Sequence, residues 1–357
     1  MHKKLFIPGP TEVREDILQA QSQWMIGHRT KVFGDMYSGI VNKLKKMLFT
    51  TKNTMVFSSS GTGVMEGAIR NCVRKTVLHC VNGAFSDRWA KISQACGKDV
   101  SLIEVPWGES IKPRMIEEKL RAGGVEAVAL VQNETSTGVR SPIEKIAEVM
   151  KAFPEIIWLV DTVSSLGGDL LRIDELGIDV TIASTQKAFA LPPGMAVAVV
   201  SQKAMDKTKT VFDRGYYFDF DAMQKRFEKD HQTPCTPAVS LFFALDKQLD
   251  KILAEGMENR YRRHVEMAEF TRAWVKKYFK MFAEQGYESV TLTTAMNNKG
   301  IKVADLNTEL GKRGFQISNG YGKLKEATFR IAHMGDLTLD EIKELLKNIE
   351  DILKLNK

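Results

Sequence analysis

The sequence has 357 residues and a formal net charge of +7, from 51 lysine and arginine residues against 44 aspartate and glutamate residues. Because the basic residues are interspersed with acidic ones, the charge disfavours a nucleic-acid surface and suits small anionic ligands. The hydrophobic content of 43% supports a large core in two domains. No apolar run resembles a signal peptide or approaches the ~20 residues of a membrane helix, so we expect a cytoplasmic protein with no membrane contact.

The N-terminal segment is predicted to be an extended arm. The run Pro8-Gly9-Pro10-Thr11 favours an extended or turned backbone rather than a helix. Such an arm needs a surface to lie against. After it, apolar residues between Phe33 and Leu48 recur at spacings of three and four, which indicates an amphipathic helix.

From residue 54 the pattern changes to short apolar runs that alternate with helix-like segments. The seven runs are Met55 to Phe57, Thr76 to Val81, Val100 to Val105, Ala127 to Val131, Ile156 to Val160, Val180 to Ala183 and Ala196 to Val200. Continuous apolar strands between helices indicate an α/β fold whose mostly parallel, seven-stranded sheet is buried on both faces. Ligands bind at the carboxyl ends of such strands, so the polar residues that follow each strand are candidate site residues.

After residue 201 the strand rhythm stops. Residues 205–235 are rich in aromatic side chains and are interpreted as a long irregular functional or interface loop. A helical stretch with a break near Gly256 leads into a smaller α+β unit. Its expected elements are strands at 290–293, 300–303 and 329–332 and helices at 305–313 and 339–355. We therefore expect an arm at 1–20, a large domain at 21–245 and a small C-terminal domain at 246–357.

The first strand is followed by hydroxyl residues and glycine, including Ser60, Gly61 and Thr62, at the start of a helix. Free backbone amides at a helix N-terminus bind anions, and glycine lets a phosphate approach the backbone closely. The alternative is a serine-rich helix cap. Phe85, after the second strand, either stacks on a planar ligand or belongs to the core.

Two charged residues follow later strands. Asp161 ends a fully apolar strand, where a carboxylate is costly unless it is paired with a cation or a strong donor; capping of the next turn is the alternative. Lys187 precedes a Pro-Pro-Gly turn in rigid apolar sequence that disfavours the charged ammonium. A lysine with a lowered pKa is what a Schiff base needs, whereas a solvated lysine at a strand end is the alternative.

Together the strand ends supply a phosphate cradle, a stacking ring, an acidic partner for a pyridine nitrogen and an amine nucleophile, and Thr135 adds a polar group. The common cofactor that needs all four is pyridoxal 5′-phosphate. No metal site is expected, because the six histidines are scattered and the four cysteines lack ligand spacing.

Longer motifs occur in the same order along nearly the whole chain. They are Phe6-Ile7-Pro8-Gly9-Pro10-Thr11, Gly27-His28-Arg29, Ser60-Gly61-Thr62, the runs 134–138, 160–168, 184–188 and 192–194, and Phe329 to Gly335. With these motifs the chain closely resembles the class V aminotransferases of fold type I, in particular the alanine–glyoxylate/serine–pyruvate branch. The resemblance implies the fold type I architecture, pyridoxal 5′-phosphate as the cofactor and a homodimer with shared active sites.

The resemblance also implies the roles of individual residues. Lys187 would form the Schiff base with the cofactor and later move a proton, and Asp161 would keep the pyridine nitrogen protonated. Arg330 would clamp the substrate α-carboxylate, with Gly9 of the arm lying over the substrate. The remaining cofactor contacts would come from Ser60, Gly61, Thr62 and Gln186 at the phosphate, Phe85 stacked on the ring, and Thr135 and Val163 beside it.

Across the dimer interface, Thr236 is the best match to a threonine that contacts the phosphate in the family. Three residues earlier, where some relatives have a tyrosine, this chain has Thr233, so that contact is open. His28, His231 and His333 are further residues expected near the site, each equally interpretable as structural.

The predicted activity is transfer of an amino group from alanine or serine to glyoxylate or pyruvate by a ping-pong mechanism. An aspartate aminotransferase is an alternative, although the sequence shows no second arginine or lysine for a distal carboxylate. A desulfurase or lyase is less favoured, because no cysteine follows Cys235. A scaffold without cofactor is disfavoured by the presence of both Lys187 and Asp161.

Overall fold

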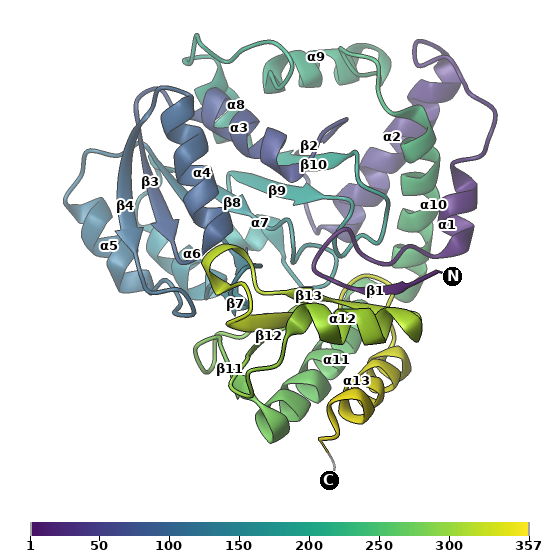
Figure 1. Cartoon of the computed structure of the whole chain (residues 1–357). Coiled ribbons are helices and arrows are strands. Elements are labelled where there is room, and N and C mark those ends of the chain that lie inside the picture. Colours follow the sequence, from purple (N-terminus) through teal and green to yellow (C-terminus); the bar gives the residue numbers. More distant parts are fainter. Residues whose placement is uncertain (1, 356–357) are drawn as a thin grey trace.

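The computed structural model describes residues 2–355 and contains two main β-sheets with helices packed around them (Figure 1). The larger sheet has the strand order β2-β10-β9-β8-β5-β3-β4. Its strands are β2 (Asn53–Phe57), β3 (Thr76–Val81), β4 (Asp99–Glu104), β5 (Ala127–Val131), β8 (Ile157–Asp161), β9 (Val180–Ser184) and β10 (Ala196–Val200). Only β10 runs antiparallel to its neighbours in this sheet. The seven predicted strands and the mostly parallel α/β sheet are therefore confirmed.

Helices cover both faces of this sheet, because successive strand residues point to opposite sides. In β2, Val56 packs into one core while Met55 and Phe57 pack into the other. The first core includes residues of α1 (Glu15–Ala20), α2 (Lys31–Met47), α5 (Pro113–Arg121), α6 (Ile143–Lys151), α7 (Ile173–Leu176) and α10 (Val239–Glu255). The second includes residues of α3 (Gly61–Cys72), α4 (Ala84–Ala95), α8 (Gln202–Thr208) and α9 (Phe220–Asp230).

The segment 205–235, predicted to be irregular, contains the end of α8 and all of α9, so that prediction was wrong. Asp219 caps α9, since its side chain accepts from the N–H groups of Asp221 and Ala222. Phe220 is fully buried against the large sheet. The aromatic residues that suggested a loop are thus partly core residues of an amphipathic helix.

The smaller sheet has the order β1-β13-β14-β12-β11 and lies below the large sheet in Figure 1. Its strands are β1 (Lys4–Phe6), β11 (Lys280–Met281), β12 (Leu292–Met296), β13 (Phe315–Asn319) and β14 (Thr328–Ala332). The helices α11 (Met257–Tyr278), α12 (Val303–Lys312) and α13 (Leu339–Leu353) pack with this sheet in a third core. The N-terminal arm therefore adds a strand to the smaller sheet, since β1 pairs in parallel with β13.

The strand predicted at 300–303 is absent from the described chain. Gly300 has a positive φ of 63°, and the N–H of Val303 donates to the side chain of Glu326 instead of to a neighbouring strand. The segment therefore turns into α12. Of the two neighbours of β14, β12 corresponds to the strand predicted at 290–293, whereas β13 was not predicted.

The helical stretch breaks where expected, at Gly256, whose φ is +79°. The division of domains at residue 245 stays a prediction; it falls inside α10, whose Leu249 and Ile252 still pack in the core of the large sheet. Short strands β6 (Asn133–Glu134) and β7 (Val139–Arg140) form a separate pair beside the large sheet. No helix within residues 2–355 has the length and apolarity to cross a membrane.

Candidate active site

A cavity of about 140 Å³ lies at the edge of the large sheet where β2, β3, β5, β8 and β9 end. The loops after these strands reach the same edge because the five strands run in the same direction. The predicted residues that line it are Ser60, Gly61, Thr62, Phe85, Thr135, Asp161, Val163, Gln186 and Lys187, and the cavity is also lined by Met65, Arg88 and Ser164. The structure thus brings together side chains that are up to 127 residues apart in the sequence, Ser60 and Lys187 being the most distant pair.

Lys187 lies in the turn that follows β9, a turn held by the hydrogen bond from the N–H of Leu191 to the carbonyl of Thr185 at 3.1 Å. Its Nζ donates to the carbonyl oxygen of Pro8 at 2.6 Å. Burial, with the nearby Arg330 charge as the second cause, lowers the pKa of Lys187 to about 8. The neutral, nucleophilic form of this amine is therefore much more populated near neutral pH than it is for an exposed lysine, although the charged form still predominates below pH 8.

The N-terminal arm lies directly over Lys187. A Cβ atom on Gly9 would be 2.4 Å from the lysine Nζ, and the φ of Gly9 is +142°, so this position requires glycine. Thr11 fixes the arm to the lysine turn: its N–H donates to the carbonyl of Gln186 at 3.1 Å and its hydroxyl to the carbonyl of Lys187 at 2.9 Å. The predicted position of Gly9 over the site agrees with this geometry.

Asp161 is the last residue of β8 and is almost fully buried. Its Oδ1 accepts from the N–H of Val163 at 2.6 Å, while Oδ2 has no hydrogen-bond partner within residues 2–355. Burial raises the pKa of Asp161 to about 7, a shift that the Val163 bond opposes and the charge of Glu134 reinforces. The carboxylate therefore faces the cavity with an unused oxygen and would be stabilised by a cationic donor.

The N-terminus of α3 faces the same cavity with Ser60, Gly61 and Thr62. Ser60 is the N-cap residue, and its side chain makes no capping hydrogen bond. A Cβ atom on Gly61 would be 2.7 Å from Cγ2 of Val163, so a larger residue would displace the wall of the cavity. The unpaired amides of this helix start suit an anion such as a phosphate.

Phe85 is held at the start of α4 by a buried carboxylate that the sequence analysis did not identify. Glu134 accepts from the N–H groups of Phe85 and Ser86 at 3.1 and 2.9 Å, and from the Ser136 hydroxyl at 2.7 Å. A carboxylate at a helix N-terminus is stabilised by the helix dipole as well as by these donors. Glu134 therefore fixes the backbone that carries the Phe85 side chain.

The sequence analysis recognised no second arginine for a distal carboxylate, and the structure places one, Arg88, in the wall of the cavity. It lies one helical turn after Phe85 on α4, so the two side chains share a face of the helix. This spacing in the sequence was the signal that could have identified it. Its Nη2 donates to the hydroxyl of Tyr321, a residue of the smaller sheet's β13–β14 connection, at 2.8 Å.

Arg330, in the middle of β14, reaches the site from the smaller sheet. Its guanidinium donates to the carbonyls of Asn319 at 3.1 Å and Thr135 at 3.2 Å. Burial lowers the pKa of Arg330 to about 10, and it forms no ion pair with any carboxylate in the described chain. A buried arginine with only carbonyl partners is suited to bind an anionic ligand.

Comparison with protein families supports the same reading. The family model of the class V aminotransferases matches residues 12–345. The chain belongs to the class V aminotransferases. Members of this family use pyridoxal 5′-phosphate, so this chain is a pyridoxal-phosphate-dependent aminotransferase.

Three similar proteins illustrate the range of the family. The chain is 35% identical to an L-aspartate–glyoxylate aminotransferase of Paracoccus denitrificans, over 94% of this chain and 87% of that protein. It is 34% identical to a serine–glyoxylate aminotransferase of Methylorubrum extorquens, over 93% and 86%. The solved structure of an alanine–glyoxylate aminotransferase from Nostoc sp. has a TM-score of 0.93 at 28% identity and covers 99% of this chain and 96% of that chain.

The cavity of this aminotransferase fits its cofactor. Asp161 offers an unused oxygen for a protonated pyridine nitrogen, and the open start of α3 suits the phosphate. Lys187, with its lowered pKa, supplies the amine. These three groups line one cavity, which is the arrangement that the cofactor requires.

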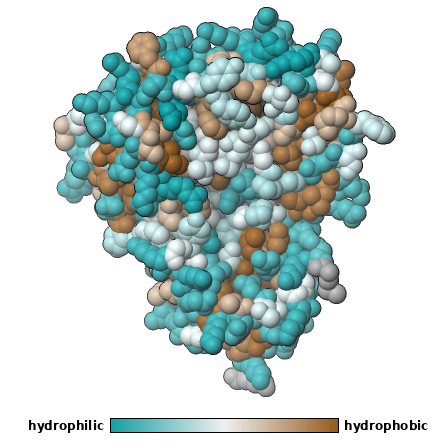
Figure 2. All heavy atoms as spheres, turned by 45° about the horizontal axis from the view of Figure 1, so that its top comes forward, coloured by the Kyte–Doolittle hydropathy of each residue, from teal (hydrophilic) through white to brown (hydrophobic). Residues whose placement is uncertain are grey.

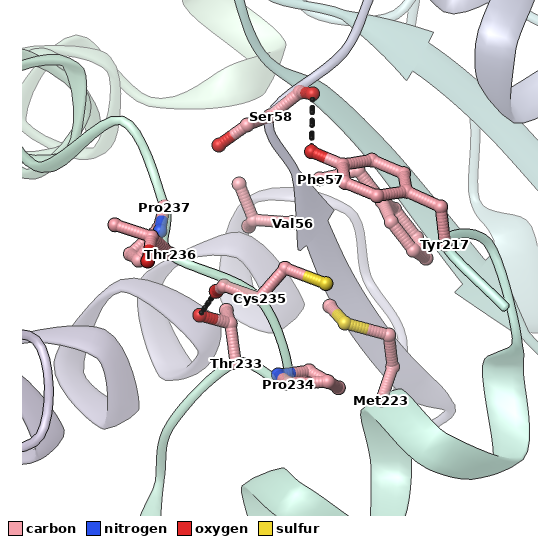
Figure 3. Close-up of a pocket in the computed structure, with 10 residues that line it drawn as sticks. All are labelled: Val56, Phe57, Ser58, Tyr217, Met223, Thr233, Pro234, Cys235, Thr236 and Pro237. Atoms are coloured by element: carbon pink, nitrogen blue, oxygen red, sulfur yellow. Dashed lines mark hydrogen bonds between the residues drawn. The ribbon is translucent and has the colours of Figure 1, made fainter.

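Thr233 and Thr236 do not line this cavity within one chain. They belong to a smaller pocket below the end of β2, drawn in Figure 3. The Thr233 hydroxyl donates to the Cys235 carbonyl at 2.7 Å (Figure 3), whereas Thr236 is exposed and its hydroxyl lies 3.5 Å from Nε2 of His28. A role of Thr236 at the phosphate therefore requires a second chain.

The other two histidines have structural surroundings. His231 is the left-handed C-cap residue of α9, with φ of 51°. His333 is fully buried, and its Nε2 lies 2.9 Å from the Thr293 hydroxyl. Neither lines the cavity around Lys187.

Proposed function

We propose that this aminotransferase moves the amino group of alanine or serine to glyoxylate or pyruvate in two half-reactions that share one site. The observation that carries the proposal is the position of Arg330, a buried guanidinium without a carboxylate partner in the described chain, which donates to the carbonyl of Thr135, a residue that lines the Lys187 cavity. The names of the three relatives support glyoxylate as an acceptor, because it occurs in each while the amino donor differs.

The substrate α-carboxylate binds Arg330 in this proposal. A guanidinium grips a carboxylate through two parallel hydrogen bonds, which orients the Cα–H bond of the substrate relative to the cavity. Lys187 Nζ then takes the proton from Cα and returns one during the second half-reaction. The arm at Gly9 lies against this amine, at a position where a side chain larger than hydrogen would collide with the lysine.

The cofactor, when bound, accepts the amino group and the electron pair left at Cα. In our proposal Asp161 holds a proton on its ring nitrogen, and Phe85 packs on the ring. The proposed phosphate contacts are Ser60, Gly61, Thr62 and Gln186 of the same chain, with Thr135 and Val163 beside the ring and Thr236 from a second chain. We do not include Thr233 among the phosphate contacts of its own chain, since its hydroxyl donates to the Cys235 carbonyl.

A homodimer is part of the proposal. Several large apolar side chains are exposed in the single chain, including Trp24 and Phe212, each 96% exposed, and Tyr216 at 82%. Figure 2 shows apolar patches on both sides of a central area of intermediate hydropathy. Burying such side chains against a second copy would be favourable and would also bring Thr236 to the partner's cavity. We also propose that the protein is cytoplasmic.

Desulfurase chemistry is the alternative with different products. It needs a nucleophilic cysteine, and none of the residues that line the Lys187 cavity is a cysteine. Cys235 lines the separate pocket of Figure 3. An aspartate donor, by contrast, uses the same transfer chemistry and differs only in the substrate.

The proposal is tested by following the absorbance of the cofactor-loaded protein in single half-reactions. Each of alanine, serine, aspartate and cysteine is added alone, and then glyoxylate or pyruvate is added. We expect alanine or serine to bleach the cofactor absorbance and glyoxylate to restore it, with glycine as the product. Sulfide release from cysteine without a response to any other amino acid would contradict the proposal.

A further inference from the structure

A second arginine with unused donors reaches the cavity of Lys187. Arg88 lines that cavity and forms no ion pair with any carboxylate in residues 2–355. One of its N–H groups donates to the Tyr321 hydroxyl at 2.8 Å. Because a guanidinium has five N–H donors, most of the hydrogen-bonding capacity of Arg88 remains available to a ligand.

Two aromatic rings hold the Arg88 guanidinium in place. Its Cζ lies 4.9 Å from the centre of the Phe85 ring. The rings of Phe85 and Tyr321 are 5.2 Å apart, with an angle of 32° between their planes. A guanidinium that is already packed on a ring loses little conformational freedom when it binds an anion.

Tyr321 connects Arg88 to Arg330. The Arg330 Cζ lies 5.6 Å from the centre of the Tyr321 ring, whose hydroxyl accepts from Arg88. The two guanidinium groups are therefore separated by no more than one tyrosine side chain, a span that suits a short dicarboxylate. The Tyr321 hydroxyl hydrogen has no acceptor in the described chain, so it can donate to the same anion as Arg88.

The backbone around Tyr321 is closely fitted. A Cβ atom on Gly320 would be 1.9 Å from the carbonyl oxygen of Leu324, and Gly322 has a φ of +56°. The carbonyl of Asn319 is also fixed, because it accepts from Arg330. The loop thus holds Tyr321 between the two arginines before any ligand binds, which reduces the entropic cost of recognition.

We propose that Arg88 and Tyr321 bind the distal carboxylate of L-aspartate, so that this short dicarboxylic amino acid is also a donor. The inference rests on the proposed function, because it places the α-carboxylate on Arg330. Aspartate gives up its amino group to the cofactor and leaves as oxaloacetate, and glyoxylate then receives that amino group and leaves as glycine. Arg88 and Tyr321 act on the side chain of the donor and take no part in the proton transfer at Cα.

The test measures kcat/KM for L-aspartate and L-alanine in half-reactions of the cofactor-loaded protein. We expect Arg88→Gln to lower the value for aspartate by roughly 30-fold, since it removes a charged partner from a partly buried carboxylate. Tyr321→Phe, which keeps the ring, should lower it roughly fivefold. Both variants should lower the value for alanine much less than the value for aspartate, because alanine has no distal carboxylate.

The matched control is Lys91→Gln, which removes a positive charge from the exposed face of the same helix. It should change kcat/KM for neither aspartate nor alanine. Arg88→Lys retains the charge but not the planar guanidinium. Its kcat/KM for aspartate should lie between those of the wild type and Arg88→Gln. Equal losses for aspartate and alanine in Arg88→Gln would overturn the proposal, as would a wild-type protein that uses alanine and not aspartate.

Binding of succinate, measured by calorimetric titration of the same protein, separates this inference from the proposed function. Succinate has two carboxylates and no amino group, so its affinity does not depend on transamination. We expect Arg88→Gln to weaken succinate binding roughly 30-fold and to leave binding of butyrate unchanged. An unchanged affinity for succinate would refute the Arg88 assignment even if no amino donor reacted; a protein that binds succinate as expected but transfers no amino group would refute the proposed function alone.

Discussion

Arg260 and Arg330 are both buried, yet their surroundings differ. Arg260 on α11 forms ion pairs with Glu255 at 2.8 Å and Asp336 at 3.0 Å, and it donates to the carbonyls of Gly167 and Ala188. Arg330 has only two carbonyl partners and no carboxylate in the described chain. Arg260 therefore completes a network between the two parts of the molecule, whereas Arg330 retains donors for a ligand.

The same difference separates the buried charges of the cavity from those elsewhere. Lys98 is almost fully buried and pairs with Asp213 at 2.8 Å. Lys187 is half-buried and has only the Pro8 carbonyl as a hydrogen-bond partner, and Asp161 keeps one oxygen unused. A buried charge that the protein leaves without a counter-ion costs stability, and such costs are concentrated at functional sites. The comparison predicts opposite effects of mutation in the two groups.

The largest effect is expected for Asp161→Ala. The variant should lower kcat by roughly 1,000-fold, because it removes the charge that stabilises the protonated ring of the bound cofactor. Cofactor binding, measured by equilibrium dialysis, should weaken much less, because the contacts at the start of α3 remain. Turnover close to that of the wild type would exclude Asp161 from this role.

Arg260→Gln should have the opposite profile. It removes the charge of a buried guanidinium that bonds two carboxylates and two carbonyls, so we expect the free energy of unfolding to fall by about 3–5 kcal/mol even though Glu255 keeps Arg263. Denaturant unfolding of the purified variant measures this. The folded fraction should keep its KM for both substrates, and a selective rise in KM would instead place Arg260 in the substrate site.

Lys187→Met should make the cofactor-free protein more stable. Burial lowers the lysine pKa from 10.5 to about 8, so below pH 8 the folded state carries a charged buried amine. Replacing it should raise the free energy of unfolding on the order of 3 kcal/mol at pH 7. Between pH 8 and 10.5 the folded protein loses this proton before the unfolded chain does, so wild-type stability rises and the difference disappears.

The experiment compares unfolding curves of the two cofactor-free proteins at pH 7 and at pH 10. Lys91→Met, at an exposed lysine, is the control and should show no such pH dependence. An equal stability of wild type and Lys187→Met at pH 7 would show that the buried amine is not a source of strain.

The large sheet could be predicted from sequence because each strand is a short apolar run bounded by turn residues. The smaller sheet was harder. β13 has polar residues at Gln316, Ser318 and Asn319 and was missed, and the partner of its edge, β1, lies more than 300 residues earlier in the chain. Such pairing depends on tertiary contacts that local sequence does not encode.

The site was predictable where function is concentrated at strand ends. Asp161 and Lys187 follow apolar strands, and the structure brings them to one cavity. Glu134 and Arg88 were missed as site residues for different reasons. Glu134 lies in a polar loop, and the sequence does not show that it is buried. Arg88 lies among other polar residues of a helix, where its spacing from Phe85 was the one signal and its contact with Tyr321 depends on the fold.

The smallest effect is expected for Arg330→Lys, which tests the geometry of the unpaired arginine rather than its charge. Lysine keeps the positive charge but binds a carboxylate as a point donor, so the two parallel hydrogen bonds are lost. We expect KM to rise roughly 30-fold for amino acid and oxo acid together, because both bind through the same α-carboxylate. The free energy of unfolding should change by less than about 1 kcal/mol, since no protein carboxylate depends on this side chain.

Arg260→Lys sharpens the comparison because the chemical change is identical. The Arg260 guanidinium binds Glu255 and Asp336, so Arg260→Lys should lower the free energy of unfolding and leave KM unchanged in the folded protein. A rise in KM confined to Arg330→Lys, together with a fall in stability confined to Arg260→Lys, would establish that ligand binding and folding use separate buried arginines. An unchanged KM in Arg330→Lys would remove Arg330 from the substrate site, and the unpaired guanidinium would then need another ligand.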